Sequence, residues 1–131
     1  MRVLLVDDHA SVRRALRTLL QLEPDIDVVG EAANGQMAVD LTRHLQPDVV
    51  LMDITMPTMN GIEATRAIHA EFPRVCVIGL SVHDRDKLAE LMRDAGAMDY
   101  VAKSAPPEEL LVVMRGCYAR LREDLPPAIG L

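Results

Sequence analysis

The stretch VVLMDITMPTMNG, residues 49–61, contains the pattern on which the predicted fold depends. Four consecutive apolar residues, Val49 to Met52, end at Asp53 and are followed by a segment that contains turn residues. A short, uninterrupted apolar run is typical of a strand that is buried on both faces of a sheet. We therefore predict a central strand with a carboxylate at its carboxyl end.

Similar runs recur along the chain and alternate with segments of helical periodicity. The other strands are expected at Val3 to Val6, Val75 to Leu80 and Met98 to Ala102, with a weaker one at Ile26 to Gly30. The helices are expected at Ala10 to Leu22, Gln36 to Leu45, Ile62 to Glu71, Asp84 to Ala95 and Pro107 to Leu121. This alternation predicts an α/β fold with right-handed crossovers. We expect a doubly wound (βα)5 parallel sheet of order 2-1-3-4-5, in a flavodoxin-like three-layer sandwich.

Two turns between these elements can be predicted from their glycines. Asn60-Gly61 is expected to supply a turn with positive φ before the third helix, and Gly96 is expected to end the fourth. Both expectations are structural rather than functional.

Length and composition limit the classes of protein that need to be considered. The chain has 131 residues, half of them hydrophobic and 26% charged, which predicts one folded domain. Its net charge of −6 opposes binding to DNA, and with only three aromatic residues it lacks a platform for base stacking. No apolar run approaches the ~20 residues that span a bilayer. Cys76 and Cys117 form no CxxC motif, so we expect two buried free thiols and a cytoplasmic protein.

Polar side chains follow the strands at one edge of the predicted sheet. Asp7 and Asp8 end the first strand, Asp53 the third, Ser81 the fourth and Lys103 the fifth. Each has an ordinary alternative: Asp8 or Ser81 could cap a helix, Asp53 could bond loop amides and Lys103 could be solvated. Together they converge where ligands bind in this architecture.

Three neighbouring carboxylates repel one another unless one is protonated or a cation holds them. An all-oxygen site of this kind suits Mg²⁺. Such an ion beside an ammonium and a hydroxyl would clamp the oxygens of a phosphoryl group in transit. Asp53 is the candidate nucleophile, because all these groups surround it and a carboxylate can form an aspartyl phosphate.

The motifs at these strand ends resemble those of a response-regulator receiver domain. They are VLLVDD (Val3 to Asp8), DITMPTMNG (Asp53 to Gly61), Leu80-Ser81 and YVAK (Tyr100 to Lys103). LSVHD (Leu80 to Asp84) and KSAPPEEL (Lys103 to Leu110) resemble the NarL/FixJ-type subgroup. The resemblance implies a receiver domain at residues 1–122, followed at 123–131 by a C-terminal tail or the start of a linker.

The resemblance also implies roles for the site residues. Asp53 would accept phosphate from a histidine kinase or a histidine phosphotransfer domain. Asp8 would bind Mg²⁺ directly, Asp7 through water, and the Thr55 carbonyl would complete the protein ligands. Ser81 and Lys103 would contact the phosphoryl oxygens, and Tyr100 would turn inward as Ser81 moves, changing the face formed by the fourth helix, fifth strand and fifth helix. His83 could lie over the phosphoryl group or be a solvated loop residue.

Rival functions lack a necessary motif. A phosphohydrolase of the haloacid-dehalogenase type needs DxD, whereas Asp53 is followed by Ile54 and Thr55. A nucleotide-binding module needs GxGxxG or GxxxxGK[ST] after a strand. A receiver-like domain that has lost phosphorylation would lack an acid or the lysine. The expected function is therefore regulatory.

Partners and output are less closely defined by the sequence. The effector domain or partner protein would lie outside this chain, with no nucleic acid bound by residues 1–131. Phosphorylation-dependent dimerisation stays open, as does the choice between an excised receiver and a hybrid-kinase or stand-alone relay receiver.

Overall fold

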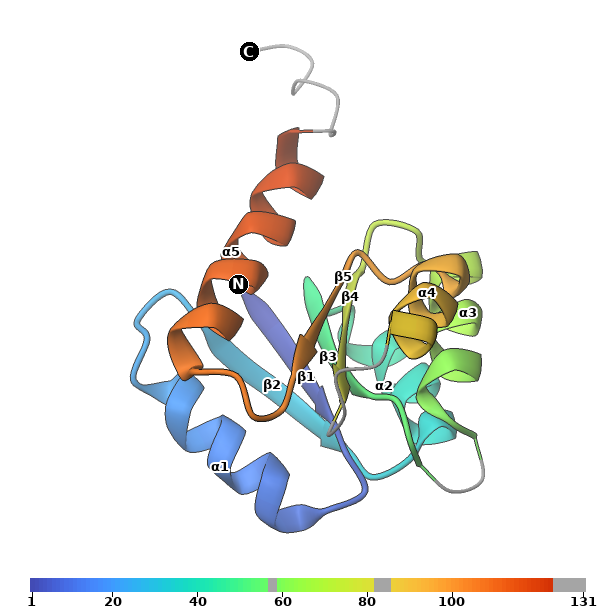
Figure 1. Cartoon of the computed structure of the whole chain (residues 1–131). Coiled ribbons are helices and arrows are strands. Elements are labelled where there is room, and N and C mark those ends of the chain that lie inside the picture. The colour runs from blue at the N-terminus through green and yellow to red at the C-terminus, as the bar shows by residue number, and fades with distance from the viewer. Residues whose placement is uncertain (57–58, 82–85, 124–131) are drawn as a thin grey trace, which may run out of the picture.

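The computed structural model describes residues 1–56, 59–81 and 86–123, in which five strands alternate with five helices (Figure 1). The elements are β1 (Arg2–Val6), α1 (Ala10–Gln21), β2 (Asp27–Ala32), α2 (Gly35–Leu45), β3 (Val49–Asp53), α3 (Gly61–Glu71), β4 (Cys76–Ser81), α4 (Asp86–Ala95), β5 (Asp99–Ala102) and α5 (Pro107–Glu123). Every predicted strand and helix is therefore present in the predicted order.

The five strands form one parallel sheet of order β2-β1-β3-β4-β5, which confirms the predicted doubly wound fold. Asp53 is paired with Leu80, and Ser81 with Ala102, at the carboxyl ends of their strands. The sheet therefore carries Asp53 and Ser81 to the same edge.

Helices cover both faces of the sheet, with α1 and α5 on one side and α2, α3 and α4 on the other (Figure 1). Alternate residues of a strand face opposite layers. In β1, Val3 and Leu5 belong to the core under α1 and α5, whereas Leu4 and Val6 belong to the other core. Burial on both faces explains why these strands are apolar without interruption.

Two expectations from composition can be compared with the structure. Cys76 and Cys117 are buried free thiols, as predicted. Among the helices of the described residues, none is long and apolar enough to cross a membrane.

The expected positive φ at Asn60-Gly61 is wrong. Asn60 has φ −74°, and its side chain caps α3 by accepting a hydrogen bond from the Glu63 N–H at 2.9 Å. Glycine is needed at position 61 because a Cβ there would lie 2.1 Å from the Asp53 carbonyl oxygen. The constraint is thus the close approach of α3 to the end of β3. Gly96, at φ +116°, does end α4 as predicted.

We predict that Gly61→Ala destabilises the domain by about 3 kcal/mol or more, because the new methyl group must displace backbone beside Asp53. Gly116→Ala is the matched control: a Cβ at this exposed helical position would meet nothing within 4 Å. The control should gain about 0.5 to 1 kcal/mol. Urea denaturation measures both. Equal stability of the two variants would show that the approach to Asp53 imposes no constraint.

Candidate functional site

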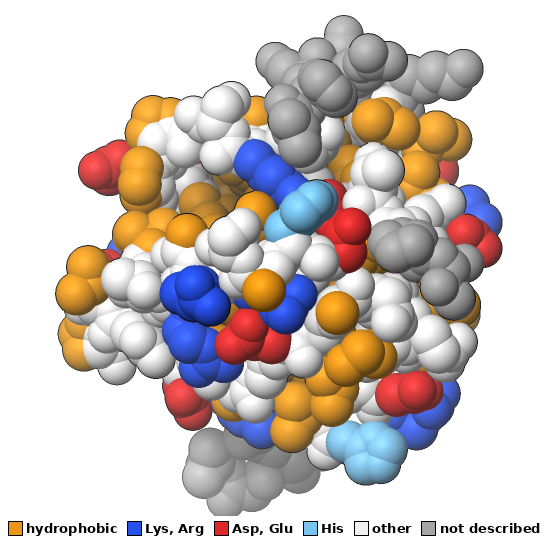
Figure 2. All heavy atoms as spheres, turned by 90° about the horizontal axis from the view of Figure 1, so that it is seen from below, with side chains coloured by type: hydrophobic (Ala, Val, Ile, Leu, Met, Phe, Trp, Pro, Cys, Tyr) orange, Lys and Arg blue, Asp and Glu red, His pale blue; other side chains and the backbone are white. Residues whose placement is uncertain are grey.

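The candidate site lies at the carboxyl edge of the sheet, where β1, β3 and β5 end. Asp7 and Asp8 directly follow β1, Asp53 is the last residue of β3, and Lys103 directly follows β5. Figure 2 looks onto this edge and shows acidic side chains beside a histidine, with basic side chains nearby. The carboxyl edge of the sheet therefore holds the residues that were predicted to meet: the three acids, Ser81 and Lys103.

Lys103 joins two of the acids. Its Nζ lies 2.6 Å from Asp7 Oδ2 and 3.3 Å from Asp53 Oδ1. Asp7 is 0% exposed and Asp53 3%. Little water reaches these charges, so the ammonium provides compensation that solvent would otherwise give.

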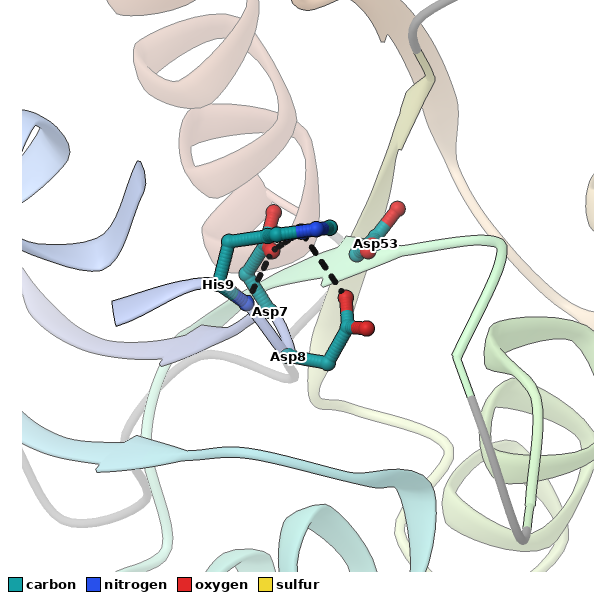
Figure 3. Close-up of side chains that lie close together, drawn as sticks. All are labelled: Asp7, Asp8, His9 and Asp53. Carbon is teal, nitrogen blue, oxygen red and sulfur yellow. Dashed lines mark hydrogen bonds and ion pairs between the residues drawn. The ribbon is translucent and has the colours of Figure 1, made fainter. Parts of the chain in front are cut away.

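Asp8 and His9 complete the group of side chains (Figure 3). His9 Nδ1 lies 3.2 Å from Asp7 Oδ1 and 3.1 Å from Asp8 Oδ1. The His9 backbone N–H also donates to Asp7 Oδ1 at 2.9 Å. The ring thus lies across the acid pair at the start of α1.

Burial and the neighbouring charges shift the pKa values of Asp53 and Lys103. Burial, and then the charge of Asp7, raise the pKa of Asp53 to about 6, against the opposing effect of Lys103. Burial acts to lower the pKa of Lys103, but the hydrogen bond to Asp7 and the charge of Asp53 raise it overall. Lys103 therefore stays charged at neutral pH, and Asp53 is ionised at an energetic cost.

The residues present fit a divalent cation. One ligand atom from each of Asp7, Asp8, His9 and Asp53 lies within 4.8 Å of the others. Three carboxylates face one ammonium, which leaves an excess of negative charge. Asp8 Oδ1 is shielded from solvent and accepts no hydrogen bond, one of two such side-chain atoms in the described part of the chain. The nitrogen 3.1 Å away on the His9 ring is a cation only when the ring is protonated, so a bound metal ion would supply the partner that this oxygen lacks.

The other predicted residues lie close to this edge but have less defined roles. Ser81 is buried, and its carbonyl accepts a hydrogen bond from the Lys103 N–H at 2.6 Å. Tyr100 is half-buried against the core under α2, α3 and α4. Thr55 is exposed, and its backbone hydrogen-bonds to the Asp53 carboxylate. His83 lies outside the described residues.

Two residues of the site were not predicted. His9 was given no role, although its position next to Asp7-Asp8 in sequence was a usable signal. Arg13 donates from Nη1 to the Asp7 carbonyl at 2.5 Å, and its Nε pairs with Glu31 at 3.1 Å. The sequence contains no signal for the role of Arg13. Its contact with Asp7 depends on the direction in which α1 leaves β1.

Comparison with known proteins agrees with this geometry. A family model described as the response regulator receiver domain matches residues 3–115. The nitrate/nitrite response regulator protein NarL of Escherichia coli K12 is 37% identical over 98% of this chain and 61% of its own length. The response regulator UvrY of the same strain is 43% identical over 93% of this chain and 56% of its own length. The chain thus spans little more than half of these relatives.

Solved structures extend the comparison. A LuxR-family two-component response regulator from Aurantimonas sp. SI85-9A1 has a TM-score of 0.87 and 39% identity, covering 91% of this chain and 85% of that one. The CheY of a CheX-CheY-BeF3-Mg+2 complex from Borrelia burgdorferi has a TM-score of 0.83 and 26% identity, covering 90% and 89%.

The chain therefore belongs to the response regulator receiver domain family, the phosphoacceptor regulatory modules of two-component signalling. Its relatives are of the NarL/FixJ/LuxR type, which confirms the predicted subgroup. The acidic pocket of Asp7, Asp8 and Asp53 with Lys103 is typical of the phosphoacceptor site of such domains.

We predict that Asp53→Asn stabilises the metal-free domain at pH 7.5 by about 1 to 3 kcal/mol. The folded-state pKa of about 6 exceeds the usual value of 3.8, so the folded state binds the proton more tightly. The stabilisation that the protonated Asp53 side chain contributes to the fold is therefore lost progressively as the pH rises from 3.8 to above 6.

Urea denaturation in a chelator, from pH 3.5 to 8, measures this effect. The advantage of Asp53→Asn should disappear below pH 4, whereas Asp27→Asn, at an exposed position in β2, should have a small effect throughout. A destabilised Asp53→Asn at pH 7.5 would contradict the prediction.

Proposed function

We propose that this domain transfers a phosphoryl group from a phosphohistidine of a histidine kinase, or of a histidine phosphotransfer domain, to Asp53. The observation that carries the proposal is the contact of Lys103 with both Asp7 and Asp53, beside a shielded oxygen of Asp8 that accepts no hydrogen bond. In the transfer, a carboxylate oxygen of Asp53 attacks phosphorus, the bond between phosphorus and the histidine nitrogen breaks, and an acyl phosphate forms.

Asp53 is the favoured nucleophile among the three acids. Asp7 is engaged by the Lys103 ammonium at 2.6 Å and by the His9 N–H at 2.9 Å. Asp53 is on the central strand, and its contact with Lys103 is longer, at 3.3 Å. Lys103 can therefore remain on Asp7 and also neutralise a phosphoryl oxygen on Asp53, whose charge develops during transfer.

We assign the cation as Mg²⁺, with Asp8 and Asp53 as direct ligands, Asp7 acting through water, and Thr55 providing its backbone carbonyl. When bound, the ion would neutralise charge on the phosphoryl oxygens. The oxygen-rich composition of the pocket supports this choice. The Borrelia burgdorferi relative, whose complex is described as containing BeF3 and Mg+2, also supports it.

Ser81 and Tyr100 are proposed to report phosphorylation to the surface. Ser81 ends β4 next to Asp53 and would donate its hydroxyl to a phosphoryl oxygen. Tyr100 lies on the neighbouring strand, where a Cβ on Gly79 would come within 3.4 Å of its ring. Movement of Ser81 toward the phosphoryl group would allow the Tyr100 ring to rotate toward the core. This rotation would change the surface formed by α4, β5 and α5.

The partner is proposed to be a cytoplasmic histidine kinase or phosphotransfer domain that approaches Lys103. A largely apolar groove of about 450 Å³ lies between α1 and the β5–α5 segment, with Leu16, Leu19, Val101, Lys103 and Leu110 among its lining residues. An apolar helix surface would fit beside the phosphoacceptor site there. Residues 1–122 would form the receiver and 123–131 a tail or linker, and the greater length of the curated relatives supports an effector elsewhere.

We predict that acetyl phosphate with Mg²⁺ adds one phosphate to the wild-type domain and none to Asp53→Ala, as measured by intact-mass spectrometry. Asp8→Ala should slow labelling at least tenfold, about 1.4 kcal/mol in the barrier. Asp27→Ala, an exposed acid at the other end of the sheet, should label normally. Full labelling of Asp53→Ala would refute the assignment.

We further predict that Ser81→Ala accepts phosphate but loses NMR shift changes in α4, β5 and α5. Bonding of the hydroxyl in only one state provides ~1 to 3 kcal/mol of differential affinity, enough to shift a two-state equilibrium. Ser81→Thr keeps the donor and should restore the distal shifts. Wild-type shifts confined to the Asp53 loop would rule out the switch.

A further inference from the structure

A pair of cysteines lies at the opposite end of the sheet from Asp53. Cys76 is the first residue of β4, and Cys117 lies in the middle of α5, which covers that part of the sheet. Both residues are 0% exposed and belong to the same buried cluster, where each thiol lies close enough to shift the pKa of the other. The two thiols therefore already lie near each other in the core of the reduced protein.

A cation distinguishes the two thiols. Arg120, exposed one turn after Cys117, donates from Nη2 to Cys117 Sγ at 3.2 Å. The hydrogen bond from Cys76 and that from Arg120 lower the pKa of Cys117, with Asp99 and burial opposing. Pairing with Cys117 and burial raise the pKa of Cys76. Cys117 is thus the better nucleophile, and Cys76 keeps its proton.

The neighbourhood of Cys117 also offers access for a small oxidant. Gly116 is exposed, and a Cβ at that position would meet nothing within 4 Å. The side chain of Arg120, an exposed residue, contacts the Cys117 sulfur and so connects it to the surface. A local opening at this part of α5 would therefore suffice to admit a molecule of the size of hydrogen peroxide, without unfolding of the sheet.

We propose that Cys117 and Cys76 form an oxidation site, at which hydrogen peroxide produces a disulfide that joins α5 to β4. The Cys117 thiolate attacks one peroxide oxygen, the O–O bond breaks, and the departing hydroxide takes a proton to leave as water. The Cys76 sulfur then attacks the sulfenic acid, and a second water leaves as the S–S bond forms. Two thiols are oxidised by two electrons in total, and one peroxide is reduced to two waters.

The disulfide would fix α5 on the sheet. β4 carries Cys76 at its first residue and Ser81 at its last, so one strand would connect the oxidation site to the phosphoacceptor edge. The site itself uses neither Asp53 nor a metal ion. The proposal therefore stands independently of phosphorylation.

The test is peroxide oxidation of the full chain, followed by intact-mass spectrometry and peptide mapping without reductant. We expect a monomer that has lost two hydrogen atoms, with Cys76 and Cys117 in one linked peptide, reversed by dithiothreitol. Cys76→Ser should instead trap a sulfenic acid on Cys117 that reacts with dimedone. Intermolecular disulfides as the main product, or a persistent sulfenic acid in the wild type, would overturn the proposal.

Arg120→Gln tests the role of the guanidinium. Without the guanidinium the pKa of Cys117 should rise, and the smaller thiolate fraction, partly offset by greater nucleophilicity, should slow oxidation about 3-fold. Arg122→Gln is the matched control, since Arg122 donates to the Tyr118 hydroxyl at 2.7 Å. Equal rates for the two variants would overturn the nucleophile assignment. Oxidation that proceeds only as fast as global unfolding, shown by an equal urea dependence of the two rates, would overturn the site.

Discussion

The contact between Lys103 and the buried carboxylates of Asp7 and Asp53 is the interaction on which the site depends. Without it, two acids that are almost fully shielded from water would face each other with no compensating charge. The ammonium only partly relieves this, because the pKa of Asp53 is still raised to about 6 by burial and the charge of Asp7. The remaining negative charge makes the pocket receptive to a cation and to the chemistry of a phosphoryl group.

The parallel sheet brings these charges together because its strands are buried on both faces, so polar side chains are accommodated mainly at the strand ends. β1, β3 and β4 are covered on both faces, so their interiors are apolar and their carboxyl ends carry the functional groups. The backbone around the site is equally constrained, since the start of α3 passes so close to Asp53 that only glycine fits at position 61. The close packing at Gly61 and the chemistry of Asp53 therefore restrict neighbouring positions of the same site.

Much of this could be predicted from the sequence, because apolar runs and the residues that end them are local features. The strand order and the meeting of Asp7, Asp8, Asp53 and Lys103 followed from them. Side-chain direction was not predictable in this way: the ring of His9 lies across the acids. The error at Asn60-Gly61 has a similar origin. A turn dipeptide does not reveal whether its glycine is needed for a positive φ or for the close approach of neighbouring backbone. In this chain Gly61 allows the backbone of α3 to approach the end of β3, while Asn60 caps the helix.

The arginines of α5 show how a charged helix can lack a free basic face. In the sequence of α5, Arg115, Arg120 and Arg122 alternate with apolar residues, so that one face of the helix is basic and one is apolar. In the structure, Arg115 pairs with Glu23 and Asp25, Arg120 contacts Cys117, and Arg122 contacts Tyr118. These cations are committed to partners within the chain, and the net charge is −6. Electrostatics therefore disfavour a polyanion on α5 and leave the apolar groove beside Lys103 as the better surface for a protein partner.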